Sequence, residues 1–294
     1  MSFTDEGGSR RGERVRSSRV SLPLLLLAVL LLALLAMAAV LLWKTLGESV
    51  SGTSVTRDSI DSAGPEPHVR LANAAGQVRV EGKKGSRSVD YEVTRYAMAA
   101  DPAAAKQQAS EVPVDISRED SKIVVETEGG EDTGADYTLR VPTGGSVEVE
   151  SEVGDVEVSG ISGNVKVGAE AGDVMVRDVG GDVKVEAPQG DVTVGEVNTD
   201  TGGADLEVGS GDVSLEDLIL GTLEASVEAG DVTLSGRFSG GGRVSVQTGD
   251  IIARLPPEDT RDLILQTRVG SVWREPANND SHGEGSKEQK QQGS

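Results

Sequence analysis

The chain has 294 residues, of which 49 are acidic and 28 basic, so its formal net charge at pH 7 is −21. It has no cysteine and only two histidines, which excludes disulfide frameworks, thiolate metal sites and cysteine nucleophiles, and nearly excludes a His-based catalytic or zinc cluster. The acidic balance argues against a nucleic-acid partner, because no basic stripe is available to neutralise phosphates. With 38 glycines and few aromatic residues, the core is expected to consist of Val, Leu, Ile and Ala.

The N-terminal region predicts a single membrane span. Residues 22–43 run without a charge from Leu22 through Leu30 to Trp43, and as a helix they would be about 33 Å long. Residues 1–21 before them form a basic segment, whereas only Lys44 and Arg57 follow closely behind. This asymmetry predicts a cytoplasmic N-terminus and an extracytoplasmic remainder in the cell membrane. The arginines that set this topology are Arg10, Arg11, Arg14, Arg16 and Arg19.

Two alternatives to an uncleaved anchor remain open. Ala36-Met37-Ala38 resembles a signal-peptide cleavage site, but the apolar run continues five residues beyond it. A buried soluble helix that is apolar on all sides would need a large protein around it. The arginine-rich segment is also suited to contact with anionic lipid headgroups, although setting the topology is its simpler role.

The segments that flank the folded part are polar. Residues 44–66 are small and turn-rich, which predicts a flexible stalk, and residues 274–294 lack any apolar period, which predicts a disordered tail. Between them, residues 67–145 predict a β-rich part with one short helix, for which Asp101 and Pro102 supply the N-cap and first position. The strands expected there are 68–80 with a break at Gly76, 88–96, 112–116, 122–127 and 137–141.

Residues 146–273 carry a repeat of the form Gly-Asp-Val-x-Val. Its copies begin at Gly154, Gly172, Gly190, Gly211, Gly230, Gly249 and, in a degenerate form, Gly270. A half-step of similar sequence begins at Gly163 and Gly181, and later half-steps keep the strand but lose the polar turn residue, as at 223–229 and 243–247. Apolar residues at every second position predict strands with one inward and one outward face.

A fixed period of this kind predicts stacked units. Two strands per interval form one coil, and about six coils spaced by ~4.8 Å would give a rod of about 30 Å. The predicted fold is therefore all-β: a β-solenoid of stacked two-strand coils with an N-terminal β-rich cap that carries one short helix, plus one transmembrane helix. A β-sandwich is the structural alternative, but a regular half-step of nine residues does not suit hairpins of varied loop length.

The outward positions of the repeat are acidic. Residues 146–255 contain 22 acidic and 6 basic residues, a net charge of −16. By parity, Glu148, Glu150, Glu152 and Glu157 face solvent. This pattern predicts an acidic outer surface along the rod.

The corners of the repeat carry the sharpest candidate site. The residues are Asp155, Asp173, Asp191, Asp212, Asp231 and Asp250, which we call the corner aspartates. In stacked coils their carboxylates would lie ~5 Å apart, and such a row could recruit Ca²⁺, which prefers several oxygen ligands. The alternative is that each aspartate caps its turn with a side-chain hydrogen bond. No other cofactor is expected, and the Ca²⁺-binding nonapeptide pattern of β-rolls is absent.

The remaining candidates are weak. His68 and His282 are isolated and are expected to be solvated. Acidic pairs suited to glycoside hydrolysis are too abundant to single out, and the aromatic residues that stack on sugars are missing. Trp273 and Phe238 suit either a small contact patch or a cap at the end of the stack. No catalytic residues are therefore assigned, and the chain is not expected to be an enzyme.

The strings RLANAAGQVRVEG (70–82) and YTLRVPTGGSVEVESEVGDVEVSGISGNVKV (137–167) resemble the bacterial putative-adhesin family. This family of β-strand-repeat proteins is often described as a domain of unknown function and includes the LiaG-like membrane-anchored proteins. The resemblance covers about residues 66–273. It implies a β-solenoid at the cell surface, linked to adhesion or envelope stress, and it brings no catalytic residues.

These observations predict a membrane-anchored extracytoplasmic adhesin or interaction protein that presents an acidic β-solenoid to a protein or a cell-surface polymer. The first alternative is a structural envelope scaffold that self-assembles through the open ends of the solenoid. A minor alternative is an enzyme that acts on cell-wall polysaccharide.

Overall fold

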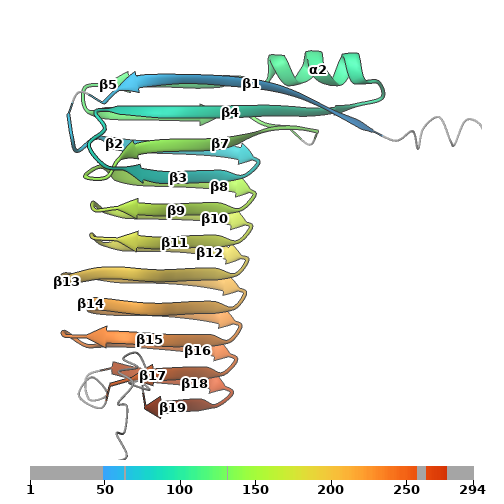
Figure 1. Ribbon diagram of the computed structural model, residues 1–294. Coiled ribbons are helices and arrows are strands. Elements are labelled where there is room, and N and C mark those ends of the chain that lie inside the picture. The colour runs from blue at the N-terminus through green and yellow to red at the C-terminus, as the bar shows by residue number, and fades with distance from the viewer. Residues whose placement is uncertain (1–48, 63, 131, 257–262, 277–294) are drawn as a thin grey trace, which may run out of the picture. The chain divides into compact units, whose positions relative to one another are not determined.

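The structure is a computed structural model, and it describes residues 49–62, 64–130, 132–256 and 263–276. The described residues form an all-β fold, a β-solenoid with one short helix, and this confirms the predicted class. Figure 1 shows the strands stacked as the rungs of a ladder, with the helix at one end. The β-sandwich alternative is wrong, because the repeat strands pair in parallel from coil to coil.

The first part of the fold contains seven strands and the helix. They are β1 (Val50–Asp61), β2 (His68–Ala75), β3 (Val78–Lys83), β4 (Ser88–Ala99), α2 (Pro102–Glu111), β5 (Val114–Glu119), β6 (Lys122–Thr127) and β7 (Thr133–Pro142). The strands predicted from alternation, and the helix predicted from its N-cap, are confirmed. Asp101 accepts hydrogen bonds from the N–H groups of Ala103 and Ala104, and Pro102 opens the first turn.

The repeat forms the rest of the stack. Its strands are β8 (Ser146–Val153), β9 (Val156–Ile161), β10 (Val165–Ala171), β11 (Val174–Val179), β12 (Val183–Gln189), β13 (Val192–Ser210), β14 (Val213–Ala229), β15 (Val232–Phe238), β16 (Gly242–Thr248), β17 (Ile251–Leu255), β18 (Leu263–Val269) and β19 (Val272–Pro276). β13 and β14 are long because each continues around a corner from face to face of the coil. In β13, the interval from Gly190 to Gly211 is 21 residues long, and a register shift between Thr199 and Gly203 accommodates its extra residues.

The parallel pairings build two faces. Face A contains, in spatial order, β6, β2, β8, β10, β12, the second halves of β13 and β14, β16 and β18. Face B contains β7, β3, β9, β11, the first halves of β13 and β14, β15, β17 and β19. The coil made by β2 and β3 therefore lies between the coil of β6 and β7 and that of β8 and β9, so the order along the stack differs from the order along the chain.

The core is the narrow interior between the two faces. The inward valines of the Val-x-Val steps are almost completely buried, as are the inward leucines and alanines. The largest fully buried side chain is Tyr137, whose hydroxyl shares a hydrogen bond with Thr127 across the interior. Stacking of small aliphatic side chains removes apolar surface from water without needing a thick core, which explains why aromatic residues are few.

Each Gly-Asp corner depends on its glycine. Gly190 has φ +135°, and a Cβ placed on it would lie 2.0 Å from the carbonyl oxygen of Gly172 in the preceding coil. The glycine is therefore required twice, once for the backbone conformation and once for the close approach of the coils. The glycines of the neighbouring corners show the same contact.

One end of the stack is capped. β4 pairs antiparallel with β7, and β1 pairs antiparallel with β4 along its whole length, from Val50–Ala99 to Asp61–Ser88. The flexible stalk predicted for residues 44–66 is therefore wrong for residues 50–61. The reason is that an edge strand gains its stability from backbone hydrogen bonds to its neighbour, which a polar sequence such as VSGTSVTRDSID permits.

The remaining predictions about the termini fall mostly outside the described residues. The predicted basic segment 1–21 and the predicted span 22–43 lie there, and so do residues 277–294 of the predicted tail. Residues 274–276 belong to β19, so the folded part ends later than predicted. Over the described ranges, no helix combines the length and the apolar character that crossing a bilayer requires.

Candidate functional site

The corner aspartates align in a single row along the stack. Oδ1 of each accepts a hydrogen bond from the backbone N–H of the residue at the same corner of the next coil. The distances are 3.0 Å from Asp173 to Asp155, 2.9 Å from Asp191 to Asp173, 2.8 Å from Asp212 to Asp191, 2.9 Å from Asp231 to Asp212, 2.8 Å from Asp250 to Asp231 and 2.7 Å from Ser271 to Asp250. In place of the predicted cap of its own turn, each corner aspartate forms a side-chain hydrogen bond that joins successive coils.

A second, shorter row lies at the opposite corner of the coil. Oδ1 of Asn164 accepts from the N–H of Asp182 at 3.0 Å, and Oδ1 of Asp182 accepts from the N–H of Gly203 at 2.9 Å. Asparagine and aspartate thus fill the same role. A negative charge is not needed for the contact, only an acceptor oxygen two bonds from Cβ.

These contacts bear on the predicted calcium site. One oxygen of each corner aspartate already accepts a backbone hydrogen bond, which leaves one oxygen for a cation. Over the described part of the chain, no three His, Cys, Asp or Glu side chains are grouped so that they could hold a metal ion. Calcium binding by the row therefore stays a hypothesis, against which the hydrogen bonds at Oδ1 argue.

A second candidate lies on face A, next to the corner aspartates. The outward positions of β8, β10 and β12 form two rows along the stack. In the first, Gly168 lies between Glu150 and Glu186 in register. In the second, Glu152 and Glu170 occupy the adjacent outward positions, followed by Pro188. Because glycine and proline project little, the neighbouring glutamates rise above a low floor.

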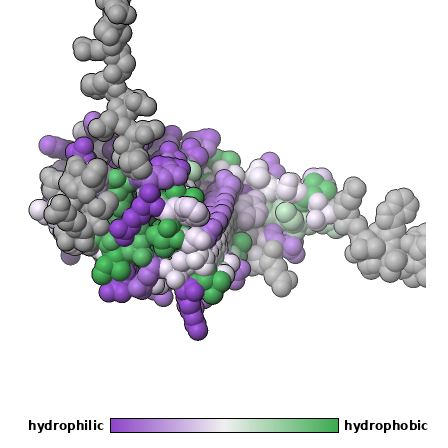
Figure 2. Space-filling model, turned by 90° about the horizontal axis from the view of Figure 1, so that it is seen from below, coloured by the Kyte–Doolittle hydropathy of each residue, from purple (hydrophilic) through white to green (hydrophobic). Residues whose placement is uncertain are grey.

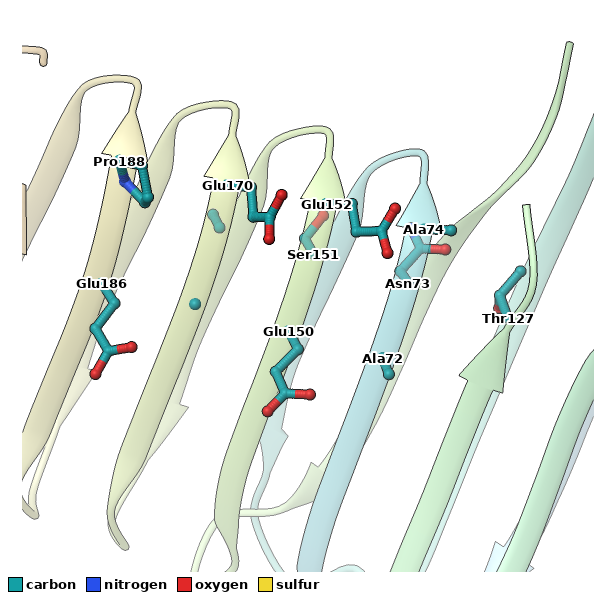
Figure 3. Close-up of a pocket in the computed structure, with 12 residues that line it drawn as sticks. Ala72, Asn73, Ala74, Thr127, Glu150, Ser151, Glu152, Glu170, Glu186 and Pro188 are labelled. Carbon is teal, nitrogen blue, oxygen red and sulfur yellow. The ribbon is translucent and has the colours of Figure 1, made fainter. Parts of the chain in front are cut away.

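This relief produces two adjoining hollows with volumes of about 430 and 460 Å³. They share Glu186 and Pro188, and we call them together the acidic groove. Figure 3 shows Glu152 and Glu170 near the corner ends of their strands, with Glu150 and Glu186 farther along the same face. The acidic residues that line the groove are Glu150, Glu152, Glu170, Glu186, Glu207 and Glu228.

Two of these carboxylates are paired with cations of the chain. Glu150 lies 2.7 Å from the guanidinium of Arg70, and Glu186 lies 2.9 Å from the ammonium of Lys184. The hydrogen bond from Lys184, together with its charge, holds the pKa of the Glu186 carboxyl below its ordinary value. The charge of both carboxylates is therefore partly compensated at neutral pH.

The other four carboxylates of the groove are not held in ion pairs, although the charge of Lys184 also acts on Glu207. Among the described residues, no cation forms an ion pair with Glu152, Glu170, Glu207 or Glu228. They belong to the coils of β8, β10, β13 and β14, and the coil of β12 lies between the second and the third. Glu152, Glu170 and Glu228 lie in the second outward row, whereas Glu207 lies in the first, in register with Glu186. The groove thus presents solvated negative charge spread over two outward rows and five coils, with a small apolar floor, which suits an elongated cationic ligand.

Sequence reasoning found the outward acids but missed the groove. The signal was present, because the outward rows are interrupted by residues that project little: Ala72, Ala74, Gly168, Pro188 and Gly209. Parity alone predicts which side chains face solvent. Where the surface is raised or hollow depends on which outward residues of different coils lie side by side, and this follows only from the register.

Face B carries a further acidic feature that the sequence analysis missed. Asp178, Glu196 and Asp217 occupy the same step of three successive coils, with φ of 51°, 54° and 52°. Gly160 fills this step in the preceding coil, with φ of 72°. In the coil that follows, the register shifts, and Gly236, with φ of 152°, pairs with Leu218. A left-handed conformation at non-glycine residues is strained. A glycine in the sequence indicates a positive φ, but no feature of the sequence indicates a positive φ at Asp178, Glu196 or Asp217.

The isolated candidates are placed as follows. His68 is partly exposed, and its Nε2 lies 3.7 Å from Glu148. Phe238 is buried inside the stack, so it contributes to the core and not to a contact patch. Trp273 is exposed on β19, in the last coil. His282 lies outside the described residues.

Three solved structures that are similar to the chain are all described as putative adhesins. A putative adhesin from Bacteroides fragilis is 15% identical with a TM-score of 0.49, and the match covers 76% of this chain and 97% of that one. Putative adhesins from Parabacteroides distasonis and Parabacteroides merdae are 14% and 13% identical, with TM-scores of 0.43 and 0.37. Each match again covers 76% of this chain, and it covers 97% and 96% of the other chain.

Among curated protein sequences, none matches the chain. The Toastrack DUF4097 family matches residues 68–294, which is most of the sequence and includes the whole repeat. The family resemblance predicted from the repeat strings is thereby confirmed. The chain belongs to the Toastrack DUF4097 family of β-strand-repeat proteins, a domain of unknown function.

Proposed function

We propose that the protein is an interaction protein of the bacterial envelope that docks a cationic partner along the acidic groove. The observation that carries the proposal is the set of four groove carboxylates, Glu152, Glu170, Glu207 and Glu228, with which no described cation forms an ion pair. Like charges held together on one face cost free energy in the free protein, and a cationic ligand recovers that energy on binding. Adhesion to a basic cell-surface polymer and docking of a basic envelope protein are both forms of this activity.

The proposal includes the location of the protein. The apolar run 22–43 is the membrane anchor, with the cytoplasm on the side of the basic segment and the solenoid outside. Because the chain has no cysteine, single-cysteine variants report this topology directly. A membrane-impermeant maleimide is expected to label Ser226→Cys in intact cells, whereas Ser9→Cys is expected to be labelled only after lysis. Labelling of Ser9→Cys in intact cells would contradict the proposed orientation.

The proposed role is docking without chemistry on the partner, and a photo-crosslinking amino acid tests it. Placed at Glu170 in the groove, the crosslinker is expected to capture a basic partner in intact envelopes, and high salt is expected to reduce the yield. Placed at Glu216 on face B, it serves as the control and is expected to give little adduct. Equal adducts from the two positions would contradict docking in the groove.

A further inference from the structure

The two ends of the stack differ in how they are closed. At the first end, α2 packs on β1 so closely that a Cβ at Gly52 would lie 2.3 Å from the backbone nitrogen of Lys106. At the opposite end, β18 pairs with β16 and β19 pairs with β17, and no strand among the described residues pairs with their outer edges. The last coil therefore exposes unpaired backbone groups on both faces.

The last coil also exposes the interior of the solenoid. Val272 occupies the position in register with Ile251, yet it is 38% exposed while Ile251 is completely buried. Leu265, in register with the buried Val244, is likewise only partly covered. The corresponding residues of the preceding coils belong to the core. Val272 and Leu265 are exposed because no described coil packs on the outer side of the last one.

Other apolar side chains surround this opening. Four of the ten exposed large apolar side chains of the described residues lie in the last coil: Ile264, Val269, Val272 and Trp273. Figure 2, which views the molecule from this end, shows hydrophobic side chains gathered on it. A monomeric soluble surface rarely leaves such a group uncovered, which indicates a contact site.

The charge of the last coil differs from that of the walls. Residues 146–255 carry a net charge of −16, whereas residues 263–276 contain Arg268, Arg274 and Glu275, a net charge of +1. Two copies side by side would bring acidic walls together, but two copies end to end would meet where this repulsion is weakest. The chain that continues past Pro276 has the sequence ANNDSHGEGSKEQKQQGS, which has no apolar side chain larger than alanine to offer.

We infer that the C-terminal coil is a self-association surface, and that two copies meet there tail to tail about a two-fold axis. In this arrangement the edges of β18 and β19 face the same edges of the second copy, and the side chains of Leu265 and Val272 become buried. The contact stops at two copies, because a two-fold contact uses the same C-terminal coil of both copies and leaves no second one free. This surface is separate from the acidic groove, and the inference does not depend on the proposed function.

The test uses the full chain in a mild detergent and exploits the absence of cysteine. Gln266→Cys places a thiol on β18 at the end, and Ser226→Cys places one at an exposed position of the same outward row, two coils inward. Mild oxidation is expected to give a disulfide-linked dimer for Gln266→Cys and not for Ser226→Cys. Equal dimer yields for the two variants, or a ladder of higher oligomers, would overturn the inference.

A second measurement covers substitutions that alter the coil itself. Val272→Lys and the rim variant Ile264→Lys are expected to shift the monomer–dimer midpoint, measured by light scattering, to at least about tenfold higher concentration. Met175→Lys is the matched control, because Met175 is 37% exposed on a side wall, and it is expected to leave the midpoint unchanged. A monomer at all concentrations overturns the inference. A dimer that forms only after deletion of residues 277–294 also overturns it, because this segment would then cover the C-terminal coil in the full chain.

Discussion

The backbone N–H of Asp191 donates a 2.9 Å hydrogen bond to Oδ1 of Asp173, the residue at the same corner one coil earlier. The bond runs along the axis of the stack, parallel to the backbone hydrogen bonds of the strands. It couples one coil to the next at a point where the chain turns. The corner aspartates therefore stabilise the register of the coils, besides forming a row of negative charge.

The first prediction separates the acceptor role of a corner aspartate from its charge. Oδ1 of Asp191 accepts from the N–H of Asp212 at 2.8 Å. Asp191→Asn keeps an acceptor at this place, as Asn164 does naturally, and removes one charge from the row. Asp191→Ala removes the acceptor, so the free energy of unfolding of this variant is expected to be about 1 kcal/mol below that of Asp191→Asn. Urea unfolding measures the difference, and equal stability of the two variants would contradict the role of Oδ1 as the acceptor that joins the coils.

The second prediction concerns the corner glycines. Gly190→Ala places a Cβ against the carbonyl oxygen of Gly172 at a backbone φ of +135°, so it is expected to cost about 3 kcal/mol or more in the free energy of unfolding. Gly168→Ala is the matched control, because no atom lies within 4 Å of the added Cβ. Its stability is expected to equal or exceed that of the parent protein. If both substitutions had the same effect in thermal unfolding, the close approach of the coils would be wrong.

The third prediction tests calcium binding by the corner aspartates. One oxygen of each is already engaged, so we expect no saturable rise in the unfolding temperature when millimolar Ca²⁺ is added. Mg²⁺ at the same ionic strength is the control for screening. A rise specific to Ca²⁺ that disappears in Asp191→Asn would instead establish a calcium site at the corners.

The fourth prediction concerns pH. The hydrogen bond from Lys166, at 2.9 Å, lowers the pKa of the Glu148 carboxyl from its ordinary value of 4.5. A pKa that is lower in the folded than in the unfolded state contributes stability above the unfolded pKa. That contribution is lost as the pH falls from about 4.5 through the folded pKa.

Lys166→Met is therefore expected to reduce the acid-induced loss of stability by at most about 1 kcal/mol, since the pair is partly exposed. Urea unfolding at pH 7 and pH 3 measures this change. Lys106→Met on the exposed surface of α2 is the control, and it should leave the pH dependence as it is. A larger pH dependence in Lys166→Met than in the parent would contradict the stabilising effect of Lys166 on the ionised carboxylate.

The comparison of sequence and structure shows where local patterns suffice. The Val-x-Val parity predicted the buried residues, and the glycines predicted the corners, because both depend on residues close together in the chain. The place of β2 and β3 between two later coils was not predictable in this way. Their alternation resembles that of β6 and β7, and the stacking order is decided by pairing between distant strands.

Pairing between distant strands also explains why the sequence analysis was wrong about β1 and missed the acidic groove. β1 is held by its hydrogen bonds to β4, and its polar side chains give no sign of them. The groove arises because Gly168 is aligned with Glu150 and Glu186 across three coils. Register is a property of the whole stack, so a single strand shows which side chains point outward and not what lies beside them.

The docking proposal is tested most directly by the affinity for a labelled decalysine peptide, measured by fluorescence anisotropy at two salt concentrations. A groove variant carries Glu→Gln at Glu152, Glu170, Glu207 and Glu228. A matched variant neutralises four acids on face B that form no ion pair with a described cation: Asp178→Asn, Glu196→Gln, Glu216→Gln and Asp217→Asn. We expect the groove variant to bind at least about tenfold more weakly than the parent, the face B variant to bind within about threefold of it, and binding to weaken with salt. Equal losses in the two variants would show that only net charge matters and would contradict a docking site in the acidic groove.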